Sequence, residues 1–271
     1  DSIGYGRTLL LPLALIFSYV ISKKKSAMDA CLLFLIIISL FMTFSRIIIA
    51  STIIIMIIIT LYNFRLRIML KGSLFLFAVI IFLILSGSVD RLVSRSVSSD
   101  NSYGINFSGR DIIYATGIPI VIASPYVGLR PGGYVSMLID GVTVEWDDGS
   151  VYKMVVRRAH SFYLVIALEW GILLLLFLLG IMFHCLYLLH KTIRLTNKYL
   201  FLEGFRHLRT WSVASIGLLT GFLIFGITDW ITYPYVFFLI GLSWSLYLIA
   251  KKSISLHLMS EVSSFTKYMT K

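Results

Sequence analysis

Residues 161–189 read SFYLVIALEWGILLLLFLLGIMFHCLYLL, and Glu169 is their one Asp, Glu, Lys or Arg. A run this long and this apolar is typical of a helix that crosses a lipid bilayer, because about 20 residues at 1.5 Å per residue span the hydrocarbon core. Similar runs occupy about 5–22, 28–45, 47–63, 72–87, 211–230 and 232–250. The sequence therefore predicts an all-α polytopic membrane protein with about seven transmembrane helices.

Composition separates this chain from soluble proteins. Hydrophobic residues make up 58% of its 271 residues and charged residues 14%, whereas charged residues are about 25% of a typical soluble domain. The chain has 24 Lys and Arg against 13 Asp and Glu, a net charge of +11, which alone would suit a nucleic-acid-binding protein. The basic residues instead cluster between the apolar runs, so we expect membrane lipid and no nucleic acid among its partners.

The basic clusters also predict the topology. They follow the first, third, fifth and seventh runs, at residues 23–25, 65–71, 191–209 and 251–271. The positive-inside rule places these connections in the cytoplasm. We therefore expect four transmembrane helices in residues 1–87, a large periplasmic loop subdomain at 88–160, three transmembrane helices in 161–250 and a cytoplasmic tail at 251–271.

The outer segment 88–160 is rich in Ser, Gly, Tyr and Asp, unlike the runs that flank it. Its residues 109–123 have the spacing of a short amphipathic helix that stops near Pro125. Residues 143–156 alternate around an Asp-Asp-Gly turn, which predicts a β-hairpin. Polar chemistry is thus expected in a small subdomain beside the membrane, which favours an enzyme over a transporter, whose sites usually lie at mid-membrane.

Of the five histidines, only His160 falls in this outer segment. It directly precedes an apolar run, and the free backbone amides of a first helical turn disfavour a positive charge nearby. A neutral imidazole at this position can accept a proton, so His160 is the candidate general base.

The arginines expected on the same outer face include Arg46 and Arg110 at helix starts, Arg130 in a Gly-Leu-Arg-Pro-Gly-Gly turn, and the adjacent Arg157 and Arg158. Guanidinium groups bind phosphate in a bidentate manner, which makes these residues candidates for a phosphate-bearing substrate. A single interfacial arginine commonly does no more than anchor a helix end among lipid headgroups. Both interpretations stay open for Arg157 and Arg158.

Glu169 lies nine residues beyond His160, about 13.5 Å along a helix at 1.5 Å per residue. An acid inside an apolar run requires a partner, and Arg46 is a candidate. We count Glu169 among the substrate-binding candidates, with a buried ion pair that joins two helices as the alternative. Acidic residues around the Asp-Asp-Gly turn are common in such turns, so no metal site is predicted.

Three pieces of this sequence resemble the O-antigen ligase and polymerase superfamily. Its motif is a histidine, a small polar residue, two residues of any kind, a leucine, and a glycine seven positions later. His160, Ser161, Leu164 and Gly171 match it at every position. Two further pieces resemble the family in the expected order, namely Thr43-Phe44-Ser45-Arg46 at an outer helix end and Gly109-Arg110 leading through Pro125 to Gly128. The resemblance covers roughly residues 30–250, and members of the family carry further N-terminal helices.

The resemblance implies a GT-C-like glycosyltransferase architecture at the periplasmic face of the bacterial inner membrane. It implies metal-independent, inverting transfer of a glycan from undecaprenyl diphosphate, without a cofactor. His160 would be the general base, and Arg46 and Arg110 would neutralise the donor diphosphate. Arg130, Arg157, Arg158 and Glu169 remain substrate-binding candidates.

Three activities fit this pattern. An O-antigen ligase would transfer the glycan to a lipid A-core acceptor, and it is the interpretation we favour. A polymerase of polysaccharide repeat units would use the same donor with a glycan acceptor. A polysaccharide flippase or exporter would instead carry charges inside its helices, and Glu169 is the one plain example here.

Overall fold

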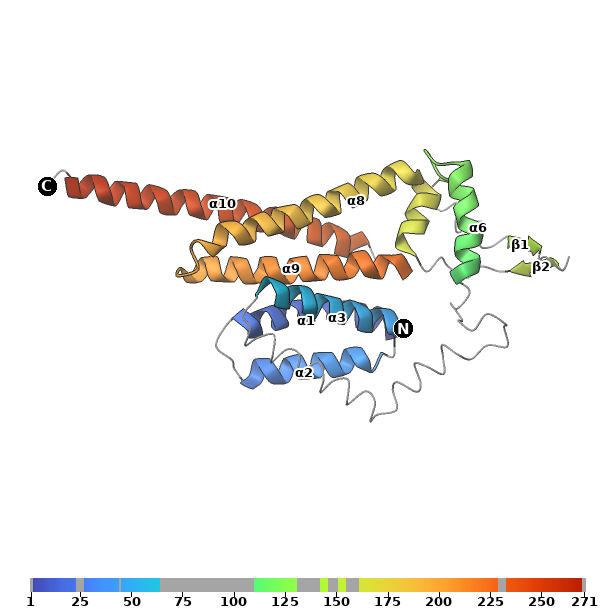
Figure 1. Cartoon of the computed structure of the whole chain (residues 1–271), viewed down its shortest axis with the longest axis horizontal. Helices are drawn as coiled ribbons and strands as arrows, with labels where there is room; N and C mark the ends of the chain where they lie inside the picture. Colours follow the sequence, from blue (N-terminus) through green and yellow to red (C-terminus); the bar gives the residue numbers. More distant parts are fainter. Residues whose placement is uncertain are drawn as a thin grey trace. The chain divides into compact units, whose positions relative to one another are not determined.

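A computed structural model describes residues 2–22, 27–43, 45–63, 110–130, 142–145, 151–154, 161–228 and 233–269 of the chain. Its helices are α1 (Ser2–Ser22), α2 (Ala27–Phe41), α3 (Arg46–Tyr62), α6 (Arg110–Ala123), α8 (Phe162–Asn197), α9 (Glu203–Thr228) and α10 (Tyr233–Met269) (Figure 1). Two strands, β1 (Val142–Glu145) and β2 (Val151–Met154), pair antiparallel.

The chain divides into two compact units. Unit 1 comprises Asp1–Gly72, Met182–Gly221 and Tyr233–Lys271, and unit 2 comprises Ser73–Ile181 and Phe222–Thr232. Helices α8 and α9 each contribute to both units.

Four of the described helices are long and apolar enough to cross a membrane: Tyr5–Ser22, Phe162–Asn197, Glu203–Gly226 and Pro234–Ser260. Two shorter apolar helices, Ala27–Phe41 and Ile47–Tyr62, occupy the predicted runs 28–45 and 47–63. The predicted run 72–87 lies outside the described residues. The chain is thus a helical membrane protein, while the number of spans and the side of each connection stay predictions.

Two helices differ from their predicted course. The run 161–189 was expected to form one helix, but α8 breaks at Gly171, where φ is 85° and ψ is 167°. The last run was expected to end at residue 250, but α10 continues to Met269. Lysines end the apolar stretch there without ending the helix, because residues 251–269 contain neither Gly nor Pro.

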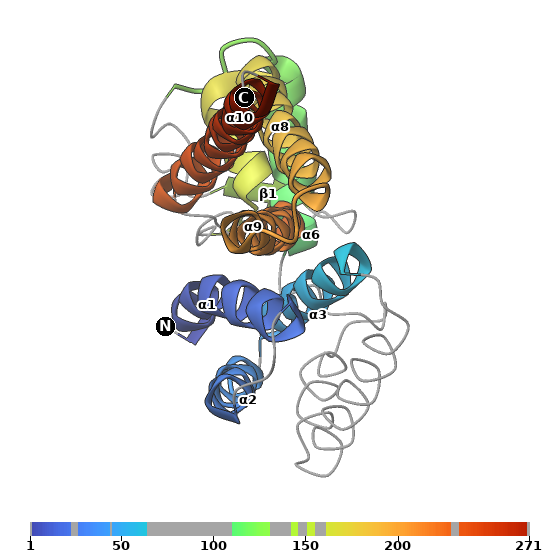
Figure 2. The same cartoon turned by 90° about the vertical axis from the view of Figure 1, so that its left-hand side faces the viewer.

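Helix α9 forms the centre of unit 1. In the apolar span of α9, 67% of the residues are buried, whereas the share is 22% in the span of α8 and 28% in that of α10. In two perpendicular views, α1 and α3 lie on one side of α9 and α10 lies on the other (Figures 1 and 2). Large apolar side chains such as Phe183, Phe237 and Leu248 are exposed on the outer helices, as expected for surfaces that face lipid.

Small residues let α3 approach α9 closely. A Cβ atom built on Gly217 would lie 2.9 Å from Ile59 Cγ1, and one on Gly221 would lie 2.6 Å from Ile55 Cγ1. Gly217 and Gly221 are four positions apart, the spacing with which small residues bring membrane helices together. The Ser51 hydroxyl also donates a 3.5 Å hydrogen bond to the Gly221 carbonyl.

One end of unit 1 is held by polar contacts of α9. The Arg209 guanidinium donates to the Asn63 side chain at 2.5 Å, to the Tyr62 carbonyl at 2.7 Å and to the Asn197 side chain at 2.7 Å. These bonds join the ends of α3 and α8 to α9, and a cation is favourable at a helix C-terminus.

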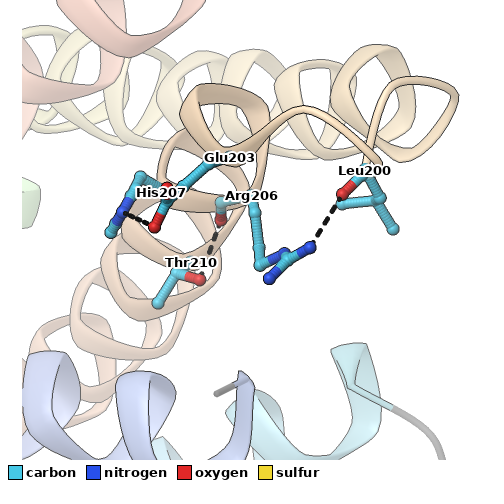
Figure 3. A network of polar contacts seen from close by, with 5 residues as sticks. All are labelled: Leu200, Glu203, Arg206, His207 and Thr210. Carbon is cyan, nitrogen blue, oxygen red and sulfur yellow. Dashed lines mark hydrogen bonds and ion pairs between the residues drawn. The ribbon is translucent and has the colours of Figure 1, made fainter. Parts of the chain in front are cut away.

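The same end of α9 carries a second group of contacts, drawn in Figure 3. Arg206 reaches the Leu200 carbonyl, the Thr210 hydroxyl donates to the Arg206 carbonyl at 2.9 Å, and His207 lies 3.6 Å from Glu203. The positive-inside rule predicts that this end lies in the cytoplasm.

Unit 2 confirms the elements predicted for the outer segment. Helix α6 begins at Arg110 and ends at Ala123, two residues before Pro125. In the hairpin, Val142 pairs with Met154 and Glu145 with Val151, so the two strands flank the predicted Asp-Asp-Gly, which itself lies outside the described residues.

Candidate active site

The predicted site residues fall in both units. Arg46 is the first residue of α3 in unit 1, and Arg110 is the first residue of α6 in unit 2; the described structure covers their backbone and not their side chains. His160, Arg157 and Arg158 lie outside the described residues. What the structure does define is the framework around the histidine motif.

Ser161 caps the helix that follows the histidine. Its side-chain oxygen accepts a 3.3 Å hydrogen bond from the Leu164 backbone N–H, and its carbonyl accepts a 3.1 Å bond from Val165. This is the standard N-cap arrangement, which satisfies amides that would otherwise have no helical partner. The small polar residue of the motif therefore fixes where α8 starts, two residues after His160.

Leu164 anchors the start of α8 in the core of unit 2. It is 7% exposed and belongs to a buried cluster with Val121, Val165, Ala167 and Leu168. On α6, a Cβ built at Gly117 would lie 3.1 Å from Leu164 Cδ2, so the two helices approach closely there. The motif leucine thereby ties α8 to the helix that Arg110 begins.

The start of α8 is also held by the end of α9. The Tyr163 hydroxyl donates a 2.6 Å hydrogen bond to the Leu223 carbonyl. Phe162, Phe222 and Phe225, which belong to the same unit, are fully buried. The residues that begin α8 are therefore held by packing on both α6 and α9.

Gly171 ends this first part of α8, which turns sharply there and leaves α6 (Figure 1). In an unbroken helix the Ile172 N–H would donate to the Leu168 carbonyl. Instead, Ile172 donates to the Pro125 carbonyl at 2.7 Å, and Leu168 accepts from Leu129 N–H at 2.7 Å. Both groups of the missing helical bond are thus satisfied by the turn that follows α6.

Two glycines make this contact possible. Gly128 has a φ of 66° and Gly171 a φ of 85°, values that side chains disfavour. A Cβ on Gly171 would lie 2.5 Å from the Tyr126 carbonyl oxygen, and one on Gly128 would lie 2.6 Å from the Leu168 carbonyl oxygen. The motif glycine is therefore required by a backbone-to-backbone contact.

Arg130 and Glu169 lie where the turn after α6 contacts the break in α8. Arg130 directly follows Leu129, which bonds to Leu168, and Glu169 directly follows Leu168. Arg130 is exposed and has a φ of 82°, an unfavourable value for a residue with a side chain. Glu169 is partly buried and has an interaction partner. Strained residues cluster at functional sites, which keeps Arg130 a substrate-binding candidate.

The turn before Arg46 is well ordered by its own side chains. The Thr43 hydroxyl donates to the Leu40 carbonyl at 2.7 Å and accepts a 3.3 Å bond from the Ser45 N–H. Thr43 and Ser45 are both buried. The Thr-Phe-Ser-Arg piece thus forms the connection between α2 and α3 and fixes the start of α3.

Sequence reasoning missed Arg7, a buried arginine in α1 with 9% exposure. Arg7, Leu10, Ala14 and Phe17 are all buried, at the spacing of one helix face. This helical spacing can be read from the sequence, where Arg7 occupies the first position of an otherwise apolar helix face.

A family model described as O-antigen ligase matches residues 31–179, which is more than half of the chain. The match includes the Thr-Phe-Ser-Arg piece, α6 and the turn after it, and the histidine motif through Gly171. No curated protein matches the chain.

Proposed function

We propose that this chain, which belongs to the O-antigen ligase family, transfers a glycan from undecaprenyl diphosphate to a lipid A-core acceptor. Family membership supports glycan transfer of the ligase or polymerase type on lipid-linked substrates by a membrane enzyme. The particular donor, the acceptor, the bacterial inner membrane and the periplasmic side are parts of the proposal.

One observation carries the proposal furthest. Ser161 caps α8, Leu164 packs it on α6, and Gly171 permits its break. Each of these motif positions thus has a scaffold role that requires its residue type. The histidine is the motif residue that offers acid–base chemistry, and the scaffold holds the chain immediately after it, as a positioned general base requires.

In the proposed reaction, an acceptor hydroxyl oxygen attacks the anomeric carbon of the donor glycan. The bond from that carbon to the diphosphate oxygen breaks, undecaprenyl diphosphate leaves, and the imidazole of His160 takes the hydroxyl proton. General base catalysis typically contributes about 10²–10⁴-fold to such a rate. Attack opposite the leaving group inverts the anomeric configuration.

Arg46 and Arg110 are proposed to bind the diphosphate and to stabilise the negative charge that grows on it as it leaves. Both begin helices, where the free backbone amides of the first turn also favour anions. Arg130 and Glu169 are proposed to position substrate at the turn after α6. Arg157 and Arg158 are proposed to contact donor or acceptor phosphate.

Lipopolysaccharide gels of a ligase-deficient strain test this proposal. The strain would carry the full-length gene as wild type, His160→Ala or His184→Ala. His184 is a matched control because it is an exposed histidine of α8 that contacts Tyr187 and Trp244 in unit 1. We expect O-antigen ladders with wild type and His184→Ala, and bare core with His160→Ala at equal protein level.

Two other results would contradict parts of the proposal. A ladder that survives in His160→Ala would remove the histidine from the chemistry. A bare core with wild type, together with a restored ladder in a polymerase-deficient strain, would replace the ligase assignment with the polymerase.

A further inference from the structure

Arg7 differs from an arginine that merely anchors a helix end at the membrane surface. Such an anchor extends its guanidinium along the lipid interface and stays exposed. Here Tyr5 is 57% exposed and Thr8 is exposed, while Gly6 and Arg7 between them are buried. The side chain of Arg7 is thus enclosed by protein in a helix long and apolar enough to span a membrane. Charged residues in such segments are costly, and they mark binding or transport sites.

The fold places Arg7 beside the start of α3. A Cβ on Gly6 would contact Thr43 Cγ2 at 2.9 Å and would also meet the side chain of Ile48. Thr43 and Ile48 flank Arg46 along the chain, at three positions before it and two after it. The α1 backbone at Gly6, next to Arg7 in the chain, therefore packs against side chains on either side of Arg46, at the start of α3.

The backbone at this end also favours an anion. Helix α3 starts at Arg46, and Ser45 makes no side-chain hydrogen bond to its first turn. First-turn amides of a helix are suited to bind phosphate, and an arginine side chain adds bidentate donors. A single phosphate group can be bound by one arginine, whereas a diphosphate offers a separate phosphate group to each of two arginines.

We propose that Arg7 binds the diphosphate of the lipid-linked donor together with Arg46, as a substrate-binding arginine outside the three family motif pieces. The inference rests on the proposed function, because that function supplies the diphosphate. It assigns to α1 a part in donor selection. Specifically, Arg7 makes the site prefer a lipid diphosphate over a lipid monophosphate or a phospholipid headgroup.

Binding to the purified full-length protein tests this without glycan transfer. The ligands are undecaprenyl diphosphate, undecaprenyl monophosphate and phosphatidylglycerol, and the readout is the dissociation constant of each. The variants are Arg7→Gln, Arg7→Lys and the control Arg194→Gln, an exposed arginine of α8. We expect Arg7→Gln to weaken undecaprenyl diphosphate binding by about tenfold or more, since hydrogen bonds to charged groups are worth that much. Arg194→Gln should bind as wild type does.

Arg7→Lys covers the case in which Arg7→Gln does not fold. A lysine keeps the charge but loses the bidentate fork. We therefore expect its preference for diphosphate over monophosphate to fall, which a purely structural role of Arg7 would not change. An unchanged preference would overturn the proposal for Arg7.

The outcomes separate this inference from the function on which it rests. If wild type binds undecaprenyl diphosphate and Arg7→Gln binds it equally well, the role of Arg7 is wrong and the proposed donor stands. If wild type binds all three lipids equally or prefers phosphatidylglycerol, the proposed donor is wrong as well.

Discussion

Gly171 is the residue at which the motif, the backbone and the packing of unit 2 depend most directly on one another. Its φ of 85° and the 2.5 Å approach of a built Cβ to the Tyr126 carbonyl oxygen leave no room for a side chain. We expect Gly171→Ala to lower the free energy of unfolding by at least about 1–2 kcal/mol, the cost of a left-handed backbone for an L-residue. Thermal unfolding of the purified protein in detergent measures this.

Gly180→Ala is the matched control for that substitution. Gly180 lies in the same helix, and nothing lies within 4 Å of a Cβ built on it. Alanine there should be neutral or stabilising by about 0.5–1 kcal/mol, because glycine is the poorer helix former. If Gly171→Ala and Gly180→Ala were equally stable, α8 would not require a glycine at position 171.

Arg130 should separate stability from activity. Its φ of 82° is unfavourable for arginine and favourable for glycine. We expect Arg130→Gly to stabilise the protein by about 1 kcal/mol and, through loss of the guanidinium, to weaken the O-antigen ladder. Arg130→Ala keeps the strain and loses the charge, so it should lower activity without the gain in melting temperature. Full activity of Arg130→Gly would show that the side chain does not contact substrate.

At the scale of elements, the packing of α3 on α9 depends on small residues. A side chain at Gly221 must displace Ile55, whose Cγ1 lies 2.6 Å from the built Cβ. We expect Gly221→Ile to destabilise the protein by about 1–3 kcal/mol through overpacking. Adding Ile55→Ala should recover part of the loss, because the two positions are in contact and their effects are not additive.

Gly241→Ile serves as the control for this pair, because Gly241 in α10 has open space around its built Cβ. The measurement is the melting temperature of Gly221→Ile, Ile55→Ala, the double variant and Gly241→Ile. Strict additivity of Gly221→Ile and Ile55→Ala would mean that α3 and α9 do not pack as described.

Elements with a periodic hydrophobic pattern were predictable from the sequence, whereas the break within α8 was not. The helix at 109–123 and the hairpin around Asp-Asp-Gly follow from hydrophobic spacing and turn chemistry, and α6, β1 and β2 confirm both. Gly171 lies in a run that stays apolar on either side, so periodicity continues through it. The break arises from Pro125 and Leu129, which are distant in sequence and supply the replacement hydrogen bonds.

The same distinction applies to the candidate site. Ser161, Leu164 and Gly171 were identifiable as motif positions, but their roles as cap, core residue and break required coordinates. Arg7 was missed because an arginine near the end of an apolar run is usually an interfacial anchor. Only its burial by neighbouring helices distinguishes it from one.

At the scale of the whole molecule, composition fixes the class and the basic clusters predict the orientation. The connection from α8 to α9 carries basic residues and is expected inside, whereas the turn after α6 belongs to the segment expected outside. Phe201 in the first and Val127 in the second are 70% and 71% exposed. The two positions are therefore matched in accessibility and should differ only in the side of the membrane they face.

Cysteine labelling in intact cells with a permeable outer membrane tests this orientation. The background carries Cys31→Ser and Cys185→Ser, which removes both native thiols. A membrane-impermeant maleimide should label Val127→Cys in intact cells and Phe201→Cys only after the inner membrane is broken, because charged reagents do not cross the hydrocarbon core. The reverse pattern would place the turn after α6 in the cytoplasm, where neither the proposed donor glycan nor a periplasmic acceptor would reach the residues at that turn.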